Sequence, residues 1–276
     1  MNIMSASAPT TGQAEAGRDF QLPPVRRWQL TLFARYVAFY FRRHFHGVHL
    51  LRQPDLSSLE GWPLLVCLNH PGWWDPLLAL YLSQTLFATR THYAPIAAAG
   101  LSKYRFFEKL GFFGIEPGTH RGATRFLQFG KAVLQSNAGA IWVTAEGEFT
   151  DVRRRPVQLR SGVGHLAHRA GRFAMLPVAL EYAFWNERSP EAFACLGKPI
   201  FISDGTLGTP EEWLSSFARA LESTQDALSV LVINRRSNAF EPLLAGVAGV
   251  GGAYDLWRNL KSLLRGRRFN PEHGVK

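Results

Sequence analysis

The chain has 276 residues, of which 46% are hydrophobic, 13% aromatic and 19% charged, with 31 Lys and Arg against 21 Asp and Glu. The length suits one large domain or two small ones, and the formal net charge of +10 indicates an anionic partner. A disordered nucleic-acid-binding tail is poor in aromatic residues, so this composition favours a phospholipid surface and disfavours nucleic acid. Two cysteines are too few for a disulfide framework or a zinc quartet.

The first 46 residues are predicted to form a leader and a membrane-associated helix. Residues 1–24 are rich in small residues and proline, which predicts a disordered leader without a secretory signal. Residues 25–46 read as a helix with many aromatic side chains, interrupted by Arg35. Because a charge at mid-span costs about 2.5–3.5 kcal/mol, we expect this helix to lie in the membrane interface and not to cross the bilayer. The same pattern also suits an amphipathic helix packed on the protein's own core.

Strand-like and helix-like segments alternate over residues 47–240. Apolar runs predict strands at 64–68, 92–98, 112–115, 140–144, 174–180 and 194–202, the last with a Gly-Lys-Pro break. Helical spacing follows Asp75 and recurs at 122–136 and 163–170, and a capping box at 209–212 precedes a long final helix. This alternation predicts an α/β fold with a mixed, mostly parallel sheet flanked by helices.

Residues 241–276 are predicted to be a flexible connector followed by a basic amphipathic helix. The glycine-rich stretch 246–252 follows no predicted strand, so a dinucleotide site is disfavoured. Residues 254–269 combine leucines and a tryptophan with five basic side chains, which suits an anionic lipid surface. A helix that packs on the core and leaves its basic face in solvent fits equally well.

The segment 69–75, Asn-His-Pro-Gly-Trp-Trp-Asp, carries the strongest chemical signal and lies between a predicted strand and a predicted helix. Histidine titrates near neutrality, so His70 suits proton abstraction from an alcohol, and a carboxylate on its other ring nitrogen fixes the tautomer. His70 and Asp75 are therefore the candidate catalytic pair. The alternative is that Asn69 and Asp75 cap the helix and that His70 is an ordinary surface histidine.

These residues resemble the first motif of the glycerolipid acyltransferases, the 1-acylglycerol-3-phosphate acyltransferase family. Segments similar to the family's second, third and fourth blocks follow in order at 111–117, 146–147 and 176–178. The resemblance covers about residues 45–200. It implies an acyltransferase α/β domain at 47–240, behind an N-terminal membrane-associated helical segment.

The implied reaction moves a fatty acyl group from acyl-coenzyme A or acyl carrier protein to the hydroxyl of a lysophospholipid or related glycerolipid. In this family the first-block histidine is the base and the aspartate orients it, which gives these roles to His70 and Asp75. Glu146 and Gly147 are expected to hold the acyl acceptor. The resemblance implies no metal and no cofactor besides the acyl donor, and it implies a peripheral or monotopic enzyme on the cytoplasmic face of a membrane.

The sequence departs from the family where arginines clamp the acceptor phosphate, because those positions are Pro117 and Phe149. Arg121, Arg153 and Arg160 are the candidate replacements from neighbouring segments. An acceptor without phosphate, such as another lipid alcohol, is one alternative, and a non-catalytic lipid-binding protein on the same scaffold is another. A lipid hydrolase is disfavoured because the chain has no Gly-x-Ser-x-Gly elbow.

Overall fold

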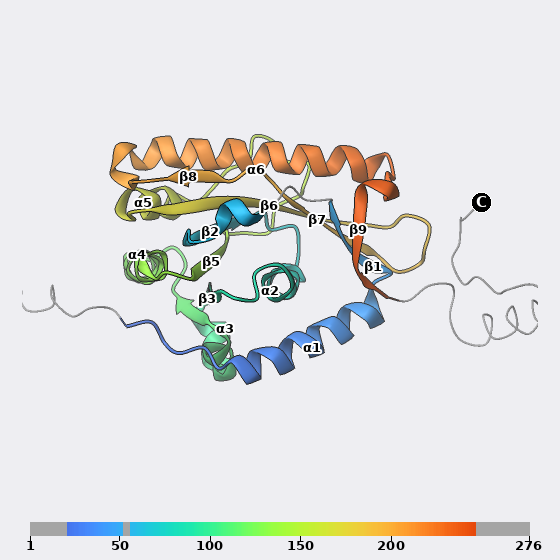
Figure 1. The fold of residues 1–276 in the computed structure, drawn as a ribbon, viewed down its shortest axis with the longest axis horizontal. Coiled ribbons are helices and arrows are strands. Elements are labelled where there is room, and N and C mark those ends of the chain that lie inside the picture. The colour runs from blue at the N-terminus through green and yellow to red at the C-terminus, as the bar shows by residue number, and fades with distance from the viewer. Residues whose placement is uncertain (1–20, 52–55, 247–276) are drawn as a thin grey trace, which may run out of the picture.

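The computed structural model describes residues 21–51 and 56–246, and its central element is a mixed sheet between two layers of helices (Figure 1). The strands are β1 Gly47–Leu51, β2 Leu64–Leu68, β3 Thr91–Ala97, β4 Phe112–Ile115, β5 Gly139–Thr144, β6 Phe173–Ala183, β7 Glu191–Leu196, β8 Ile200–Ile202 and β9 Phe240–Ala245. The α-helices are α1 Arg27–His44, α2 Asp75–Leu86, α3 Ala98–Lys103, α4 His120–Gln135, α5 Gly162–Arg169 and α6 Pro210–Ile233.

The sheet has the strand order β4-β3-β5-β2-β6-β7-β1-β9, and β8 pairs with the start of β6 on the side opposite β2. The pairings from β4 to β6 are parallel, as is that of β1 with β7, whereas β7 and β8 run antiparallel to β6 and β9 runs antiparallel to β1. The predicted α/β class with a mixed sheet flanked by helices is thus confirmed. The carboxyl ends of β2, β3, β4 and β5 consequently share one edge of the sheet.

The central strand β2 is buried on both faces, and its alternating side chains separate two hydrophobic clusters. Leu65 and Cys67 face the layer that contains α4, α5 and α6. Leu64, Val66 and Leu68 face the layer that contains α1 and α2. A strand covered by helices on both sides reads as a continuous apolar run, which is why its bounds follow directly from the sequence.

Helix α1 has two apolar stripes with different environments. The inner stripe, with Leu30, Val37 and Phe41, is buried in the cluster that α1 shares with α2 and the sheet. The outer stripe consists of four large exposed side chains, Trp28, Leu32, Tyr36 and Phe39. Among the helices that the structure describes, α1 included, none combines the length and the apolar character needed to cross a bilayer.

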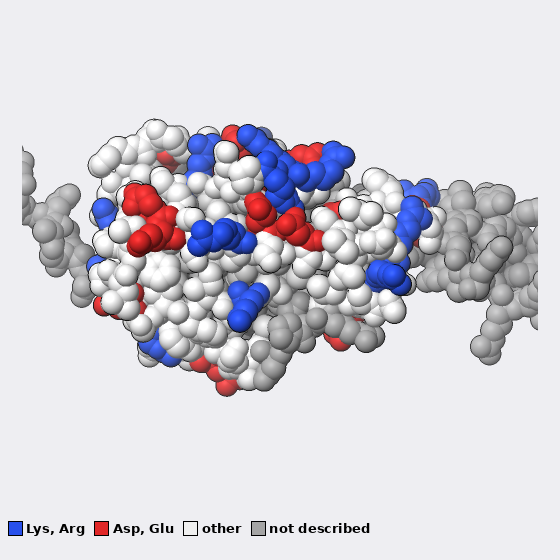
Figure 2. Space-filling view, turned by 90° about the horizontal axis from the view of Figure 1, so that it is seen from above, with Lys and Arg blue, Asp and Glu red and all other residues white. Residues whose placement is uncertain are grey.

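The opposite face of the molecule is formed by α6, which lies on the far side of the sheet from α1 (Figure 1). Figure 2 looks onto this face and shows Lys and Arg interspersed with Asp and Glu. One such pair joins Arg155 to Asp226 of α6 at 2.5 Å. This face therefore presents charges of both signs, in contrast to the positive net charge of the whole chain.

Three predicted boundaries need correction. The connector predicted from residue 241 is instead strand β9 as far as Ala245, because Pro242 is tolerated in an edge strand. Residues 21–24 of the predicted leader contact the domain, since Tyr93 Oη donates to the carbonyl of Pro23 at 3.1 Å. The segment predicted at 194–202 forms two strands, β7 and β8, on either side of its Gly-Lys-Pro break. Residues 1–20 and the predicted C-terminal helix at 254–269 lie outside the described residues.

Candidate active site

His70 and Asp75 form a direct contact where β2 ends and α2 begins. The His70 Nδ1 atom lies 2.7 Å from Asp75 Oδ2, with 17% of the His70 side chain exposed and none of the Asp75 side chain. Because a carboxylate only accepts hydrogen bonds, Nδ1 carries the proton and Nε2 is the basic nitrogen. Residues five apart on one helix point about 140° away from each other, so this contact requires His70 to precede the helix, as it does.

The turn between the two residues holds the carboxylate in place. Asp75 is the first residue of α2, where the helix dipole favours a negative charge. The backbone N–H of Gly72 also donates to Asp75 Oδ2, at 2.9 Å. Asp75 thus closes the turn that precedes its own helix and also contacts His70, and within the described residues no side-chain hydrogen bond caps the start of α2.

Asn69 ties this segment to the neighbouring strand β6 and does not cap α2. Its side-chain amide donates to the carbonyl of Leu180 at 2.9 Å and accepts the Leu180 N–H at 2.8 Å. The side chain is almost completely buried and continues the pairing in which Leu68 lies opposite Val178. This double contact fixes the backbone immediately before His70.

Glu146 lies in the turn after β5, the strand next to β2, and contacts His70 through the backbone. The His70 N–H donates to Glu146 Oε2 at 2.7 Å, and Thr150 N–H donates to the His70 carbonyl at 2.9 Å. Burial raises the pKa of the Glu146 carboxyl, and the bond from His70 N–H opposes that rise. The structure therefore places Glu146 beside the predicted base, where its carboxylate holds the His70 backbone.

Gly147 follows Glu146 in the same turn, and the Arg160 side chain packs against this turn. Gly147 has φ +73°, a conformation that favours glycine, and a Cβ there would lie 2.7 Å from Arg160 Cγ. Arg160 donates to the Glu146 carbonyl at 3.2 Å and to Glu148 Oε2 at 3.3 Å. Arg160 thus lies at the candidate site, with its guanidinium bonded to a carboxylate of the same turn.

Arg153 is exposed and bonded to a neighbouring acid. Its guanidinium donates to both carboxylate oxygens of Asp151, at 2.8 and 2.6 Å, and these bonds hold the pKa of Asp151 well below its ordinary value. Within the described residues, none of the hydrogen bonds and ion pairs of Arg153 reaches His70. Of the three predicted arginines, only Arg160 contacts the turn that holds His70.

Two exposed aromatic rings border His70. The centre of the Phe149 ring lies 4.5 Å from the centre of the His70 ring, and 64% of Phe149 is exposed. Trp73, in the turn before α2, is 65% exposed, and its ring centre lies 6.5 Å from that of Tyr40 on α1. The rim of the site is therefore aromatic, and it continues onto α1.

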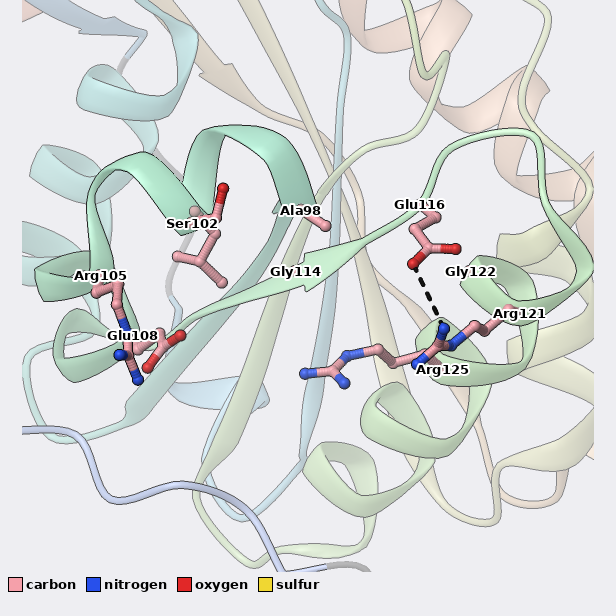
Figure 3. Close-up of a pocket in the computed structure, with 10 residues that line it drawn as sticks. Ala98, Ser102, Arg105, Glu108, Gly114, Glu116, Arg121, Gly122 and Arg125 are labelled. Carbon is pink, nitrogen blue, oxygen red and sulfur yellow. Dashed lines mark ion pairs between the residues drawn. The ribbon is translucent and has the colours of Figure 1, made fainter.

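Arg121 lies in a separate pocket of about 430 Å³ (Figure 3). The pocket is lined from α3, the end of β4, the first turns of α4 and the segment 105–110. Its charged lining residues are Arg105, Glu108, Glu116, Arg121 and Arg125. Figure 3 shows Arg125 reaching into the space between α3 and α4, while Arg121 lies 3.9 Å from Glu116. His70, Asp75 and Glu146 do not line this pocket.

Tyr182 is the site residue that the sequence did not reveal. It lies near the end of β6, and its hydroxyl donates to Asp75 Oδ1 at 2.7 Å. The strand was predicted only as far as residue 180, whereas β6 continues to Ala183. An aromatic residue two positions beyond the apolar run, a residue type that favours strands, was the available signal.

The fold and the site together define an α/β protein with a histidine–carboxylate pair at the carboxyl edge of its sheet. A scan against models of known protein families finds no match for this chain, and a search of curated proteins finds none either. Within residues 21–51 and 56–246, no group of three or more His, Cys, Asp and Glu side chains has an arrangement that suits a metal ion.

Proposed function

We propose that this protein is a membrane-peripheral acyltransferase that moves a fatty acyl group from a thioester carrier to the hydroxyl of a lysophospholipid or related glycerolipid. The observation that carries the proposal is the 2.7 Å contact between His70 Nδ1 and the fully buried Asp75 carboxylate. This contact leaves the opposite ring nitrogen, Nε2, available to accept a proton. The order of the four motif blocks supports the acyl-transfer chemistry.

In the proposed reaction, His70 Nε2 takes the proton of the acceptor hydroxyl while the hydroxyl oxygen bonds to the thioester carbonyl carbon. Asp75 stabilises the imidazolium that forms. The carbon–sulfur bond then breaks, and the imidazolium returns the proton to the leaving thiolate. The thioester is already activated, so the reaction needs no covalent acyl-enzyme.

The surroundings of His70 support a less anionic acceptor as the second candidate. Arg153 is bonded to Asp151 and Arg160 to Glu148, so both guanidinium charges are already balanced by nearby carboxylates. The ring that contacts His70 belongs to Phe149. A lipid alcohol without a phosphate near its hydroxyl suits this rim, and a panel of acceptors with and without phosphate distinguishes the two candidates.

The central experiment measures thiol release and product mass with acyl-coenzyme A and that panel. Positioned proton transfer contributes about 10²–10⁴-fold, so His70→Ala is expected to lose that much of kcat. His168→Ala is the matched control, because His168 is also half-buried but its Nδ1 contacts the carbonyl of Gly208 away from the site. Parental turnover in His70→Ala would refute the catalytic assignment. Vesicle binding without thioester consumption would favour a lipid-binding protein.

The pocket around Arg121 supports a site for the phosphate groups of the acyl donor. It opens at the ends of β3 and β4, two and three strands from β2, which is roughly 10–15 Å from His70 at ordinary strand spacing. A phosphate on the acceptor lies only a few bonds from the reacting hydroxyl. The phosphates of coenzyme A and of phosphopantetheine lie at the far end of a long arm, so they match this separation better.

The double variant Arg121→Ala, Arg125→Ala tests this assignment. Hydrogen bonds to charged groups contribute about 1.5–3 kcal/mol, so KM for the donor is expected to rise about tenfold or more. The KM for the acceptor and kcat are expected to stay near those of the parent. Arg219→Ala on α6 is the control, since Arg219 is exposed and bonds Ser215 within its own helix. A rise in the acceptor KM alone would assign the pocket to the acceptor.

The outer stripe of α1 supports docking on a membrane surface. Its four large apolar side chains are exposed, and Arg35, Arg42 and Arg43 of the same helix are exposed beside them. An interfacial helix places its aromatic rings at the boundary of the acyl chains and its arginines near the lipid headgroups. Tyr40, also on α1, lies with its ring centre 6.5 Å from that of Trp73 in the turn after His70, so the proposed docking helix neighbours the turn that carries the base.

A further inference from the structure

Tyr182 completes the set of hydrogen bonds around the Asp75 carboxylate. The His70 Nδ1–H and the Gly72 N–H both donate to Oδ2, and the Tyr182 hydroxyl donates to Oδ1. Both of the first two donors act on Oδ2, so neither of them holds Oδ1 directly. A donor on the second oxygen fixes the plane of the group, and with it the direction in which Oδ2 faces His70.

The position of Tyr182 is itself fixed by packing. Its ring centre lies 5.3 Å from that of Trp74 and 6.0 Å from that of Phe45. Burial, and the neighbouring Asp75 charge, raise the pKa of the Tyr182 phenol well above its ordinary value, so the hydroxyl keeps its proton and remains a donor. The ring of Tyr182 thus packs on the core while its hydroxyl donates to Asp75.

We propose that Tyr182 is a positioning residue for the His70–Asp75 pair, holding Oδ1 and drawing part of the carboxylate charge away from His70. The inference rests on the proposed function, because it concerns the same pair. Removing the hydroxyl concentrates the negative charge on Oδ2. His70 then binds its proton more tightly, and less of it is present as the neutral base at a given pH.

The other charges around the pair are few. Glu146 faces the pair from the turn after β5 through its bond to the His70 N–H. The positive charge of Arg155 acts to lower the pKa of Glu146, and the Arg155 guanidinium is itself paired with Asp226. From β6, the Tyr182 hydroxyl faces the pair and donates to Asp75. A change in the titration of His70 on removing one hydroxyl is therefore readily assigned, provided that these neighbours are left intact.

The test compares Tyr182→Phe with Tyr81→Phe. Both variants remove one hydroxyl and keep the ring, but the Tyr81 hydroxyl donates to the carbonyl of Leu243, away from the pair. Two quantities are measured as a function of pH: kcat/KM for acyl transfer, and the NMR titration of the His70 ring, whose signal is identified by its loss in His70→Ala. Thermal melting establishes that each variant is folded.

Tyr182→Phe is expected to lower kcat about tenfold and to move the acidic limb of kcat/KM to higher pH by about half a unit, with the NMR midpoint moving equally. The KM for the donor stays near the parental value. Tyr81→Phe is expected to leave the limb and the midpoint unchanged. An unmoved limb and an unmoved midpoint in folded Tyr182→Phe would overturn the inference, even if kcat falls.

The two proposals fail in different ways. Absence of thioester turnover in the parent overturns the proposed function. The difference in the NMR midpoint of His70 between the parent and Tyr182→Phe still tests whether Tyr182 positions the pair. If Tyr182→Phe does not fold, incorporation of 3-fluorotyrosine into the parent supplies a stronger donor without any substitution. That arm is expected to move the His70 midpoint to lower pH, and an unchanged midpoint overturns the inference.

Discussion

Replacing Trp28 and Phe39 together by serine removes the two most exposed aromatic side chains of α1. The residues are 62% and 59% exposed, and they lie on the outer stripe, so the buried stripe of the helix is left intact. We expect the double variant to stay folded and to bind anionic vesicles much more weakly than the parent. The physical reason is the loss of apolar surface that leaves water when α1 enters the interface.

The magnitude follows from the exposed areas. An aromatic side chain buries roughly 150–250 Å², so about 60% exposure leaves roughly 100–150 Å² per ring. At about 25 cal/mol per Å², complete removal of this area from water is worth roughly 2.5–3.5 kcal/mol per ring. If half of it enters the interface, the pair contributes about 3 kcal/mol, which corresponds to roughly a hundredfold in the partition coefficient.

Co-sedimentation with sucrose-loaded vesicles of phosphatidylcholine and phosphatidylglycerol measures the partition coefficient. The matched control replaces Val230 and Ile233 by serine, because these residues are 58% and 73% exposed on α6, across the sheet from α1 (Figure 1). We expect the control to bind within about twofold of the parent. Parental binding by the α1 variant, or an equal loss in the α6 variant, would show that docking does not use this stripe.

Three further predictions concern stability, Glu146 and Phe149. Burial lowers the pKa of His92 from 6.5 to about 4; its Nε2 donates to the Phe87 carbonyl, and its Nδ1 accepts from Trp142 only while the ring is neutral. The unfolded chain therefore takes up this proton first, and roughly 3 kcal/mol of stability, fully present above pH 6.5, is lost as the pH falls to 4. Urea unfolding should show a smaller pH dependence in His92→Gln than in the parent. Glu146→Gln keeps an acceptor for the His70 N–H, so its kcat should exceed that of Glu146→Ala by about tenfold, and equal losses would point to the charge itself. Phe149→Arg should raise the ratio of kcat/KM for phosphate-bearing over phosphate-free acceptors about tenfold, with Phe149→Leu as the uncharged control and an unchanged ratio as the contrary result.

The strands of the parallel half were predictable because each is a continuous apolar run with a clear break at its end. The predicted bounds of β2 and β4 coincide with the observed ones, 64–68 and 112–115. Strands β1 and β9 gave no such signal, since His49 interrupts the first and Pro242 the second. Their pairing joins segments almost 200 residues apart, and periodicity within a segment carries no information about its partner.

The site was predictable where it depends on local sequence and not where it depends on register. The spacing of His70 and Asp75 fixes a turn that the chain closes by itself, with Gly72 inside it. Tyr182 reaches Asp75 because β6 pairs with β2 in the register that sets Val178 opposite Leu68. That register is a property of the assembled sheet, so the contact between Tyr182 and Asp75 could not be predicted from the sequence.

The candidate site has a buried part, the His70–Asp75 contact, and an exposed aromatic part. Asp75 is completely buried, and its hydrogen bonds come from two backbone segments, the turn with His70 and Gly72 and the strand with Tyr182. The geometry of the pair therefore depends on how β2 and β6 pair. Phe149 and Trp73 are about two-thirds exposed and contribute little to the core. Substitutions at this rim change what approaches His70 at a small cost in folding stability, because exposed positions tolerate change. Phe149 contacts the His70 ring from this exposed rim, so its replacement is expected to leave the contact between His70 and Asp75 intact.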